Sequence, residues 1–507
     1  MGEPAALPAP VRRFLDRPGG GHLLAATSEP ATHPRVAVVG APRGHTWPAG
    51  VLTSEVGLHG GDGAVALLGR PEWPALTAVV SRRVEGAWWT VLRFAAPVDV
   101  AAVVTEVGRQ AVWGDRAASV VRTVGPDDGA DDGAALGAGD GPAGPGLLDE
   151  RVLNPAGFVP TADGPVVDLA DAVGRGEVTA AVVTALRPAA AVRVRTWDAA
   201  ATRAAAALAL AGVPVVASSA PDELGAALRD AITAPVDLAD ATAREEHSVL
   251  LRRAAFDRFS TLARRSGGAP AHPSVSILLA TRRADMLDFA LAQVARQRGV
   301  GSLELVLAPH GFDVPAARVQ DAVGPGVAVQ VLPQPETTLF GDVLHAASRA
   351  AGGDVVLKMD DDDWYAPDVV ADLLRARAWS GAEMVGMPAE LHYLAEADLT
   401  AKRGHPVEVY TAFVAGGTMM VDRMALRDAG GFRPVRKWVD AQLIDALDAL
   451  GAATYRTHGL GYVLRRNATG HTWQADLDYL LDPSRTVATW SGFRPSRLLE
   501  PDPRWTP

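Results

Sequence analysis

Residues 350–368 read AAGGDVVLKMDDDDWYAPD. Gly352 and Gly353 end a predicted helix that begins near Asp342, and the apolar residues 355–357 form a short strand. Four aspartates follow that strand directly. Ligands of open parallel sheets collect at the carboxyl ends of the strands, so we expect this stretch to build a binding site at a sheet edge.

The aspartate run is the most informative feature of the sequence. Adjacent carboxylates raise one another's pKa values, so several stay ionised only beside a positive charge, which Mg²⁺ or Mn²⁺ would supply through oxygen ligands. In an extended segment alternate side chains share a face, which places Asp360 and Asp362 at one site and turns Asp361 and Asp363 elsewhere. The alternative is a solvated acidic loop in which Asp363 caps a helix that starts near Pro367.

Residues 272–507 alternate predicted strands with predicted helices around this stretch. Besides the strand at 355–357, strands are expected at 276–280, 303–307 and 327–331. A helix follows the strand at 276–280, with an apolar stripe from Met286 to Val294. The pattern predicts an α/β fold containing a nucleotide-binding βαβ half.

Three segments precede this unit. Residues 1–124 carry short apolar runs between Gly and Pro, which predicts a small mixed or β-rich domain, and residues 125–146 form a Gly/Asp/Pro linker. Residues 147–271 predict a Rossmann-like α/β domain. Its elements are expected as strands at 180–183, 191–194 and 213–217, helices at 200–211 and 223–232, and a polar helix at 243–265.

Composition excludes several classes of protein. The 507 residues include 48 Lys plus Arg, 59 Asp plus Glu and no cysteine, so the net charge is −11. These values argue against a nucleic-acid partner and exclude disulfides and zinc–thiolate sites. No run approaches ~20 apolar residues and the start lacks a signal sequence, so we expect a cytoplasmic protein, free or peripheral at the inner face of the membrane. Lysine occurs only at 358, 402 and 437, which we interpret as coding bias.

Residues 274–473 resemble the family 2 glycosyltransferases of the GT-A fold. The resemblance is carried by the aspartate stretch and by VSILLATRR (275–283), VAGGTMMVDRMALRDAGGF (414–432) and WVDAQLIDALDALGA (438–452). A weaker likeness, over about residues 205–235, is to the donor-side half of GT-B glycosyltransferases. It carries no catalytic residue, and the preferred interpretation is a βα turn with a purely structural role.

The resemblance implies roles for several residues. Asp360 and Asp362 would hold the metal on a sugar-nucleotide diphosphate, with Asp361 beside them. The family's Glu-Asp pair corresponds to Val439-Asp440, where the Asp acts as the base on the acceptor hydroxyl. From the residues alone, Asp440 is instead a cap or dipole partner of the apolar helix that ends at Gly451.

Other roles follow from position in the family's pattern. Thr281, Arg282 and Arg283 lie where the family binds nucleotide. The family's Asp that contacts the nucleobase, after the second strand, is absent here, which leaves His310 and Asp313 as substitutes. In the segment GYVLRRNATGHTW, His471 is the candidate third metal ligand, or a surface histidine. Two arginines of the same segment, Arg465 and Arg466, could clamp the diphosphate or lie in solvent.

The expected function is metal-dependent, inverting transfer of a sugar from a nucleoside-diphosphate donor. The acceptor would be a hydroxyl of a glycan, a lipid-linked molecule or another compound in cell-surface glycan or glycoconjugate synthesis. One alternative is a sugar nucleotidyltransferase, although the loop LLATRRADML lacks the glycines of that class. The other is a non-catalytic nucleotide- or glycan-binding module with a divalent-cation site. The donor sugar, the acceptor and the oligomeric state are not readable from the sequence.

Overall fold

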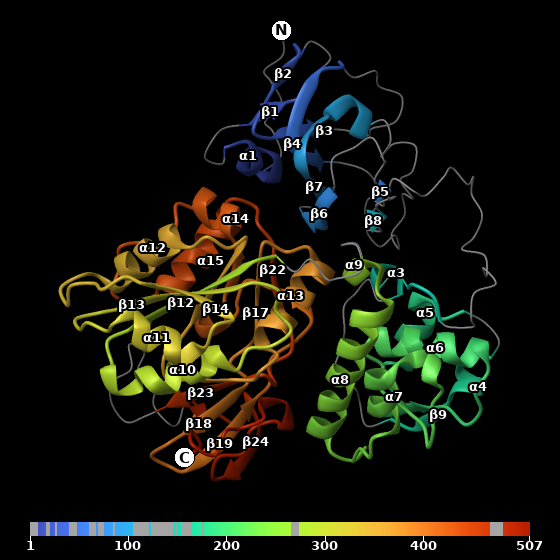
Figure 1. Cartoon of the computed structure of the whole chain (residues 1–507). Coiled ribbons are helices and arrows are strands. Elements are labelled where there is room, and N and C mark those ends of the chain that lie inside the picture. The colour runs from blue at the N-terminus through green and yellow to red at the C-terminus, as the bar shows by residue number, and fades with distance from the viewer. Residues whose placement is uncertain are drawn as a thin grey trace.

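The chain is described here by a computed structural model (Figure 1). The described residues are 9–16, 21–25, 28–39, 48–59, 67–68, 76–84, 87–104, 121–122, 145–148, 150–153, 164–174, 177–264, 273–466 and 480–507. Most of the predicted 125–146 linker lies outside them. The fold is α/β, as the sequence predicts.

The C-terminal unit is built on an eight-stranded sheet of order β14-β13-β12-β15-β21-β17-β22-β20. Its first four strands are mutually parallel, and β21 pairs antiparallel with β15. The parallel strands are β12 (Val275–Thr281), β13 (Leu303–Pro309), β14 (Val327–Val331) and β15 (Val355–Met359). The remaining strands are β17 (Met384–Gly386), β20 (Val409–Tyr410), β21 (Met420–Asp422) and β22 (Thr454–Arg456). The strands predicted at 276–280, 303–307 and 327–331 are confirmed.

Helices cover both faces of this sheet. On β12, Ile277 and Leu279 join one hydrophobic cluster and Leu278 joins another, because successive side chains point to opposite faces. The first cluster includes side chains of α10 (Leu287–Ala295), α11 (Ala316–Val323) and α13 (Val369–Ser380). The second includes side chains of α12 (Phe340–Ala350), α14 (Arg423–Asp428) and α15 (Val439–Ala449).

A second sheet begins where the aspartate run ends. Its order is β16-β23-β18-β19-β24, and β16 pairs antiparallel with β23. The strands are β16 (Trp364–Tyr365), β18 (Leu391–Leu394), β19 (Leu399–Arg403), β23 (Tyr462–Arg466) and β24 (Thr486–Ser491). The aspartates therefore lie at the junction of the two sheets.

The middle unit is a three-stranded parallel sheet packed against helices. Its strands are β9 (Val166–Asp168), β10 (Ala191–Arg193) and β11 (Val215–Val216), and its main helices are α5 (Ala180–Leu186), α6 (Ala199–Leu210), α7 (Ala226–Thr233) and α8 (Ala241–Phe259). The strand predicted at 180–183 is wrong, because the Thr179 side chain accepts a hydrogen bond from the Val182 amide and caps α5. The polar helix predicted at 243–265 is α8, which ends at Phe259; Ser260 is its C-cap, and α9 (Thr261–Arg264) follows.

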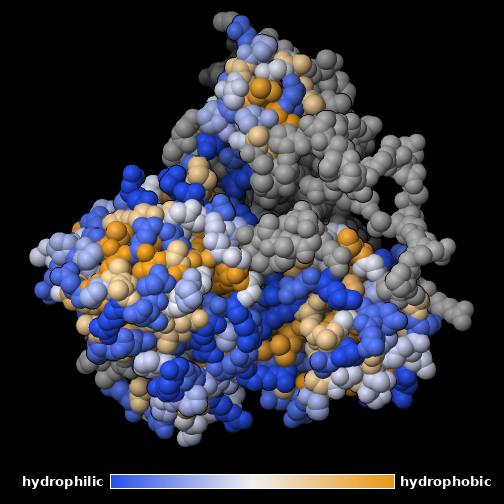
Figure 2. All heavy atoms as spheres, in the orientation of Figure 1, coloured by the Kyte–Doolittle hydropathy of each residue, from blue (hydrophilic) through white to orange (hydrophobic). Residues whose placement is uncertain are grey.

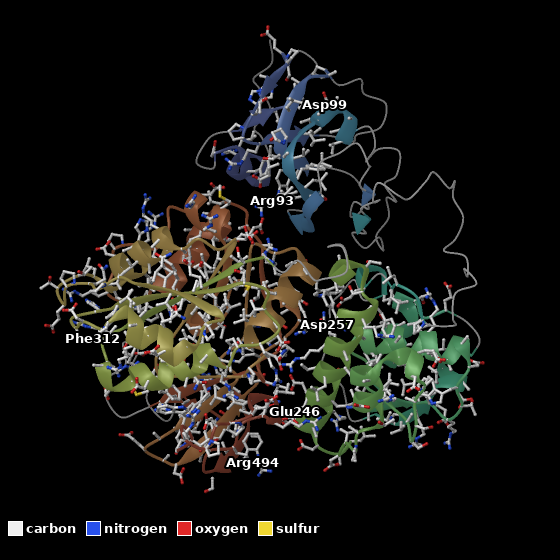
Figure 3. All side chains as sticks on the ribbon, viewed as in Figure 1. Arg93, Asp99, Glu246, Asp257, Phe312 and Arg494 are labelled. Carbon is white, nitrogen blue, oxygen red and sulfur yellow. The ribbon has the colours of Figure 1, made fainter. Side chains whose placement is uncertain are left out.

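The N-terminal unit contains a mixed sheet of order β1-β3-β4-β7-β6, with β2 pairing β4. Its elements are α1 (Ala9–Leu15), β1 (His22–Leu23), β2 (Ala31–Thr32), β3 (Val36–Val39), β4 (Val51–His59), β6 (Leu76–Val84) and β7 (Ala87–Asp99). Arg93 of β7 reaches the C-terminal unit, where its guanidinium pairs with Glu383 at 3.0 Å and with Asp422 at 3.4 Å (Figure 3).

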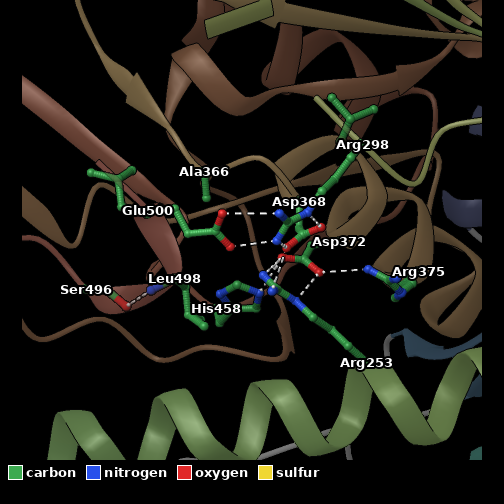
Figure 4. A network of polar contacts seen from close by, with 12 residues as sticks. Arg253, Arg298, Ala366, Asp368, Asp372, Arg375, His458, Ser496, Leu498 and Glu500 are labelled. Carbon is green, nitrogen blue, oxygen red and sulfur yellow. Dashed lines mark hydrogen bonds and ion pairs between the residues drawn. The ribbon is translucent and has the colours of Figure 1, made fainter. Parts of the chain in front are cut away.

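Ion pairs also join α8 to the C-terminal unit. Arg253 pairs with Asp372 at 2.6 Å and with Asp368 at 3.0 Å (Figure 4). Lys402 pairs with Glu245 of α8 at 2.9 Å and with Glu390 at 3.2 Å. In Figure 2, hydrophilic side chains predominate on the visible surface of both units, interrupted by small hydrophobic patches. No helix in the part of the chain that the structure describes is long and apolar enough to cross a membrane.

Candidate active site

The aspartate run lies at the carboxyl end of β15, as predicted. Its backbone is not extended, because residues 361–363 bend before the chain turns into β16. The strict alternation expected of an extended segment therefore does not apply, since the adjacent Asp361 and Asp362 share one partner. That Asp360 and Asp362 address one cation stays a prediction. Asp361 and Asp362 share Arg283, whereas Asp360 and Asp363 have other partners.

Asp361 and Asp362 both bind the guanidinium of Arg283, at the end of the neighbouring strand β12. Arg283 donates from Nη1 to Asp362 at 2.9 Å and from Nε to Asp361 at 3.2 Å, with a further contact from Nη2 to Asp361. The Thr281 hydroxyl donates to Asp361 as well. Burial raises the pKa of Asp361, and the hydrogen bonds from Arg283 and Thr281 oppose that rise. Thr281, Arg283 and Asp361 are thus brought together.

Asp360 belongs to a second cluster, centred on Lys358. This lysine lies on β15 with only 3% of its side chain exposed, and its Nζ is 2.7 Å from Asp360 Oδ1 and 3.4 Å from Asp440 Oδ1. Burial would lower the pKa of Lys358, but the two carboxylates raise it well above its ordinary range. Burial raises the pKa of Asp440, Lys358 opposes the rise, and Asp360 adds to it. One buried ammonium therefore holds the metal candidate Asp360 and the base candidate Asp440.

Two glycines let the backbone approach these carboxylates. Gly416 and Gly417 form the short 3₁₀ turn η3 (Gly416–Thr418) before β21. A β-carbon at Gly416 would collide with the Asp440 carboxylate, and one at Gly417 would lie 2.9 Å from Asp360 Oδ2. Tyr365 fixes the same corner, because its hydroxyl donates to the Gly417 carbonyl at 2.9 Å.

Asp440 does not cap its helix. Trp438 is the N-cap of α15 and Asp440 is the second helical residue, with 37% of its side chain exposed. Leu443, Ile444 and Leu447 are buried, as the predicted apolar stripe requires. The helix is therefore anchored by its apolar face and carries Asp440 at its first turn.

Asp363 has a structural role that differs from the predicted helix cap. Its carboxylate accepts hydrogen bonds from the Tyr462 hydroxyl and from the Arg465 amide at 2.9 Å, so it joins β16 to β23. Burial raises the pKa of Asp363 well above its ordinary range, and Asp362 and Asp360 raise it further. Helix α13 begins after Asp368 instead.

Three of the nucleotide-side candidates, all among the described residues, form no hydrogen bond or ion pair with the aspartate run. Arg282 is 53% exposed and donates to the Glu336 carbonyl at 3.2 Å. His310 is buried, its Nε2 is 3.2 Å from the same carbonyl, and burial and Arg282 lower its pKa. Asp313 is exposed on the loop beyond β13, next to Phe312 (Figure 3). The structure does not bring these three residues to the aspartate run.

The candidates from the last segment separate into two groups. The guanidinium carbon of Arg465 lies 4.0 Å from the centre of the Trp364 ring and 4.6 Å from that of Phe289, so Arg465 stacks on aromatic rings. Arg466 is half-buried at the end of β23. His471 lies outside the described residues.

The carboxylates suit a cation with few protein ligands. Among the described residues, no group of three or more His, Asp or Glu side chains forms a metal cage. Mg²⁺ is commonly held by one or two carboxylates, with water and substrate phosphate oxygens completing its shell. Asp360, with 35% of its side chain exposed, and the neighbouring Asp362 offer such a pair of oxygen ligands. Arg283 would share Asp362 with the cation.

Sequence reasoning missed Lys358, the glycine pair and the two tyrosines. A lysine inside an apolar strand that leads to four aspartates was a usable signal, because a buried ammonium needs an acidic partner. The partner Asp440 is distant in the sequence, so their pairing could not be inferred from spacing.

The chain was compared with protein families, with curated proteins and with solved structures. No family model matches the chain, and no curated protein matches it. One similar structure is the mannosyltransferase PcManGT from Pyrobaculum calidifontis in complex with GDP-Man and Mn²⁺, at TM-score 0.31 and 17% identity over 40% of this chain and 59% of that chain. Another is S. aureus TarS 1–349 in complex with UDP-GlcNAc, at TM-score 0.32 and 13% identity over 41% of this chain and 64% of that one. This chain thus spans only about three-fifths of those structures, and similarity of this degree does not decide its function.

Proposed function

We propose that residues 272–507 form a GT-A-type glycosyltransferase of the family 2 kind, which transfers a sugar from a nucleoside-diphosphate donor to an acceptor hydroxyl. The observation that carries the proposal is the shared contact of Lys358 with Asp360 and Asp440 at the carboxyl end of β15. A candidate cation ligand and a candidate base thus contact one buried charge, at the edge where parallel sheets bind ligands, which supports the proposal.

The donor side is formed by the ends of β12 and β15. Thr281, Arg283 and Asp361 form one hydrogen-bonded group, next to Asp362. We assign the nucleotide to this group and the divalent cation to Asp360 and Asp362. When bound, Mn²⁺ or Mg²⁺ would offset the charge that develops on the departing diphosphate.

The acceptor side is formed by the start of α15. Asp440 is fixed by Lys358 and by the close approach of Gly416, and its raised pKa suits a group that takes a proton. The acceptor oxygen forms a bond to the anomeric carbon while the bond from that carbon to the diphosphate oxygen breaks. The proton of the acceptor hydroxyl passes to Asp440, and the nucleoside diphosphate leaves. A single displacement of this kind inverts the anomeric centre.

A ligand screen tests the donor class. The full-length protein is heated with individual nucleoside-diphosphate sugars, with Mn²⁺ or with chelator, and its melting temperature is recorded. Saturating donor at about 100 times its Kd stabilises the folded state by ~2.7 kcal/mol, which is a shift of a few degrees. We expect such a shift for one donor, its loss with chelator, and its loss in D360N but not in D321N, an exposed aspartate of α11.

The screen also separates the alternatives. A nucleotidyltransferase would be stabilised by a nucleoside triphosphate with a sugar phosphate and would release pyrophosphate. A binding module would be stabilised by its ligand and would consume no donor. No stabilisation by any nucleotide sugar would refute the proposal. A glycan or lipid-linked acceptor, a role in cell-surface glycan synthesis and a place at the inner face of the membrane belong to the same proposal.

A further inference from the structure

A cationic loop leads directly into the helix that carries Asp440. Residues 433–438 read RPVRKW, and Arg433, Arg436, Lys437 and Trp438 are all exposed. Asp440 follows Trp438 by two residues, so their α-carbons lie within about 7 Å of each other. The loop lies between α14 and α15 and exposes its cations to solvent within a few residues of the proposed base.

The backbone of this loop is held in place by α12. The Gly341 amide donates to the Val435 carbonyl at 3.0 Å, and a β-carbon at Gly341 would collide with the Arg433 carbonyl. At the start of the loop, Gly431 has φ +74° and packs against the His345 ring, where a side chain would not fit. The cations are thus carried by a fixed segment.

The cations of this loop lack acidic partners. The side chains of Arg433, Arg436 and Lys437 make no hydrogen bond or ion pair with any residue that the structure describes. The exposed Arg318 of α11, by contrast, pairs with Asp288 at 2.9 Å. In a chain of net charge −11, three cations within residues 433–437 are a local excess of positive charge.

Trp438 adds an aromatic face to the same loop. Trp438 is 66% exposed, so its ring offers an aromatic face to solvent beside the cations. Its φ of +65° is rare for a bulky residue, and such strained positions cluster at ligand sites. The Trp438 carbonyl accepts from the Gln442 amide at 3.0 Å, so the strained residue also sets the start of α15.

We propose that residues 433–438 bind the acceptor and select an anionic carbohydrate, one that bears phosphate or carboxylate groups. This inference rests on the proposed glycosyl transfer. Arg433, Arg436 and Lys437 bind the anionic groups, for which guanidinium forks are suited. The Trp438 ring stacks on a sugar ring and so places one of its hydroxyls at Asp440. Asp342 on α12 is an exposed carboxylate near the anchored end of the loop, so Arg436 and Lys437, at the Trp438 end, are the main anion-binding groups.

Binding of dextran oligomers tests the proposal without knowledge of the donor. Phosphorylated dextran, carboxymethyl dextran of equal charge density and neutral dextran are titrated into the full-length protein, and Kd is measured by calorimetry. We expect one or both anionic forms to bind at least about tenfold more tightly than neutral dextran, since hydrogen bonds to charged groups are the strong ones. The tighter of the two identifies the anionic group.

Variants separate a binding role from a structural one. R436A/K437A should weaken the anionic dextran about tenfold, and W438A should weaken it several-fold while W438F retains binding. R349A, which removes an exposed arginine from the far end of α12, and M424A, which removes an exposed apolar side chain of α14, should change nothing. W438G removes the side chain and relieves the positive φ, so it should keep the fold and still lose binding.

The outcomes distinguish this proposal from the proposed function. Equal affinity for neutral and anionic dextran, or equal losses in R349A and R436A/K437A, would overturn the acceptor site and leave the donor screen untouched. Tight binding to anionic lipid vesicles with no gain for anionic dextran would overturn it as well. Loop-dependent binding of anionic dextran without any donor-induced stabilisation would support the anion site and refute glycosyl transfer.

Discussion

Lys358 is the residue whose removal tests the site most fully. Its Nζ lies 2.7 Å from Asp360 and 3.4 Å from Asp440. At 3.4 Å and an effective dielectric constant of ~20, Coulomb's law gives about 5 kcal/mol for one such pair. Both carboxylates are about one-third exposed, so solvent screens them strongly, and we expect K358M to lower the free energy of unfolding by about 1–3 kcal/mol.

Urea denaturation of four proteins measures this effect: wild type, K358M, D440N and the double variant. If Lys358 and Asp440 interact, the double-mutant cycle gives a coupling of about 1 kcal/mol. The matched control is K437M, which removes an exposed lysine and should change stability by less than ~0.5 kcal/mol. An unchanged K358M, or a coupling of zero within error, would refute the reasoning that one ammonium holds both carboxylates.

Three further predictions follow from other contacts. R93M removes the cation that Glu55, Glu383 and Asp422 share. Glu55 keeps Arg35 and Asp422 keeps Arg377, so among the described residues the buried Glu383 loses its ion pair. The variant should lower the free energy of unfolding by about 2–4 kcal/mol in the same denaturation assay. Burial raises the pKa of Glu390 from 4.5 to about 8, so its contribution to stability is full below pH 4.5 and is lost as the pH rises through 8. In urea unfolding from pH 5 to 9, the free energy of unfolding should therefore depend less on pH in E390Q than in wild type. An unchanged pH dependence would contradict the assignment. In G416A the new β-carbon displaces the Asp440 carboxylate, so the turnover of donor should fall. The control G301A adds a β-carbon where there is open space and should keep wild-type turnover. Equal turnover by G416A and G301A would contradict the placement of Asp440 as the base.

The strands and the position of the acidic run could be predicted from the sequence. Apolar runs such as Ser276–Ala280 and Val355–Leu357 are short, flanked by Gly or polar residues and buried on both faces, which is the pattern of parallel strands. Ala180–Val183 has the same apolar character but forms a helix, because Thr179 supplies a cap that composition alone does not reveal. Short apolar runs are ambiguous for that reason.

The arrangement of the site could be predicted only in part. Local spacing located the aspartates but assumed an extended segment, whereas pairing of Trp364 with Val463 bends the chain. The chain's three lysines were interpreted as coding bias, yet Lys358 lies between two site carboxylates, Lys402 joins two units and Lys437 lies on the cationic loop. The contacts of Lys358 with Asp440 and of Lys402 with Glu245 join residues far apart in the sequence, so they could not be inferred from local spacing.

The most direct test of glycosyl transfer is the turnover of D440N with the donor that the thermal screen identifies. A general base contributes about 10² to 10⁴ to the rate, so D440N should transfer sugar at least ~100-fold more slowly than wild type while its donor-induced thermal shift is unchanged. D445N, at an exposed aspartate of the same helix, should keep the wild-type rate. Wild-type turnover by D440N would contradict the assignment of Asp440 as the base.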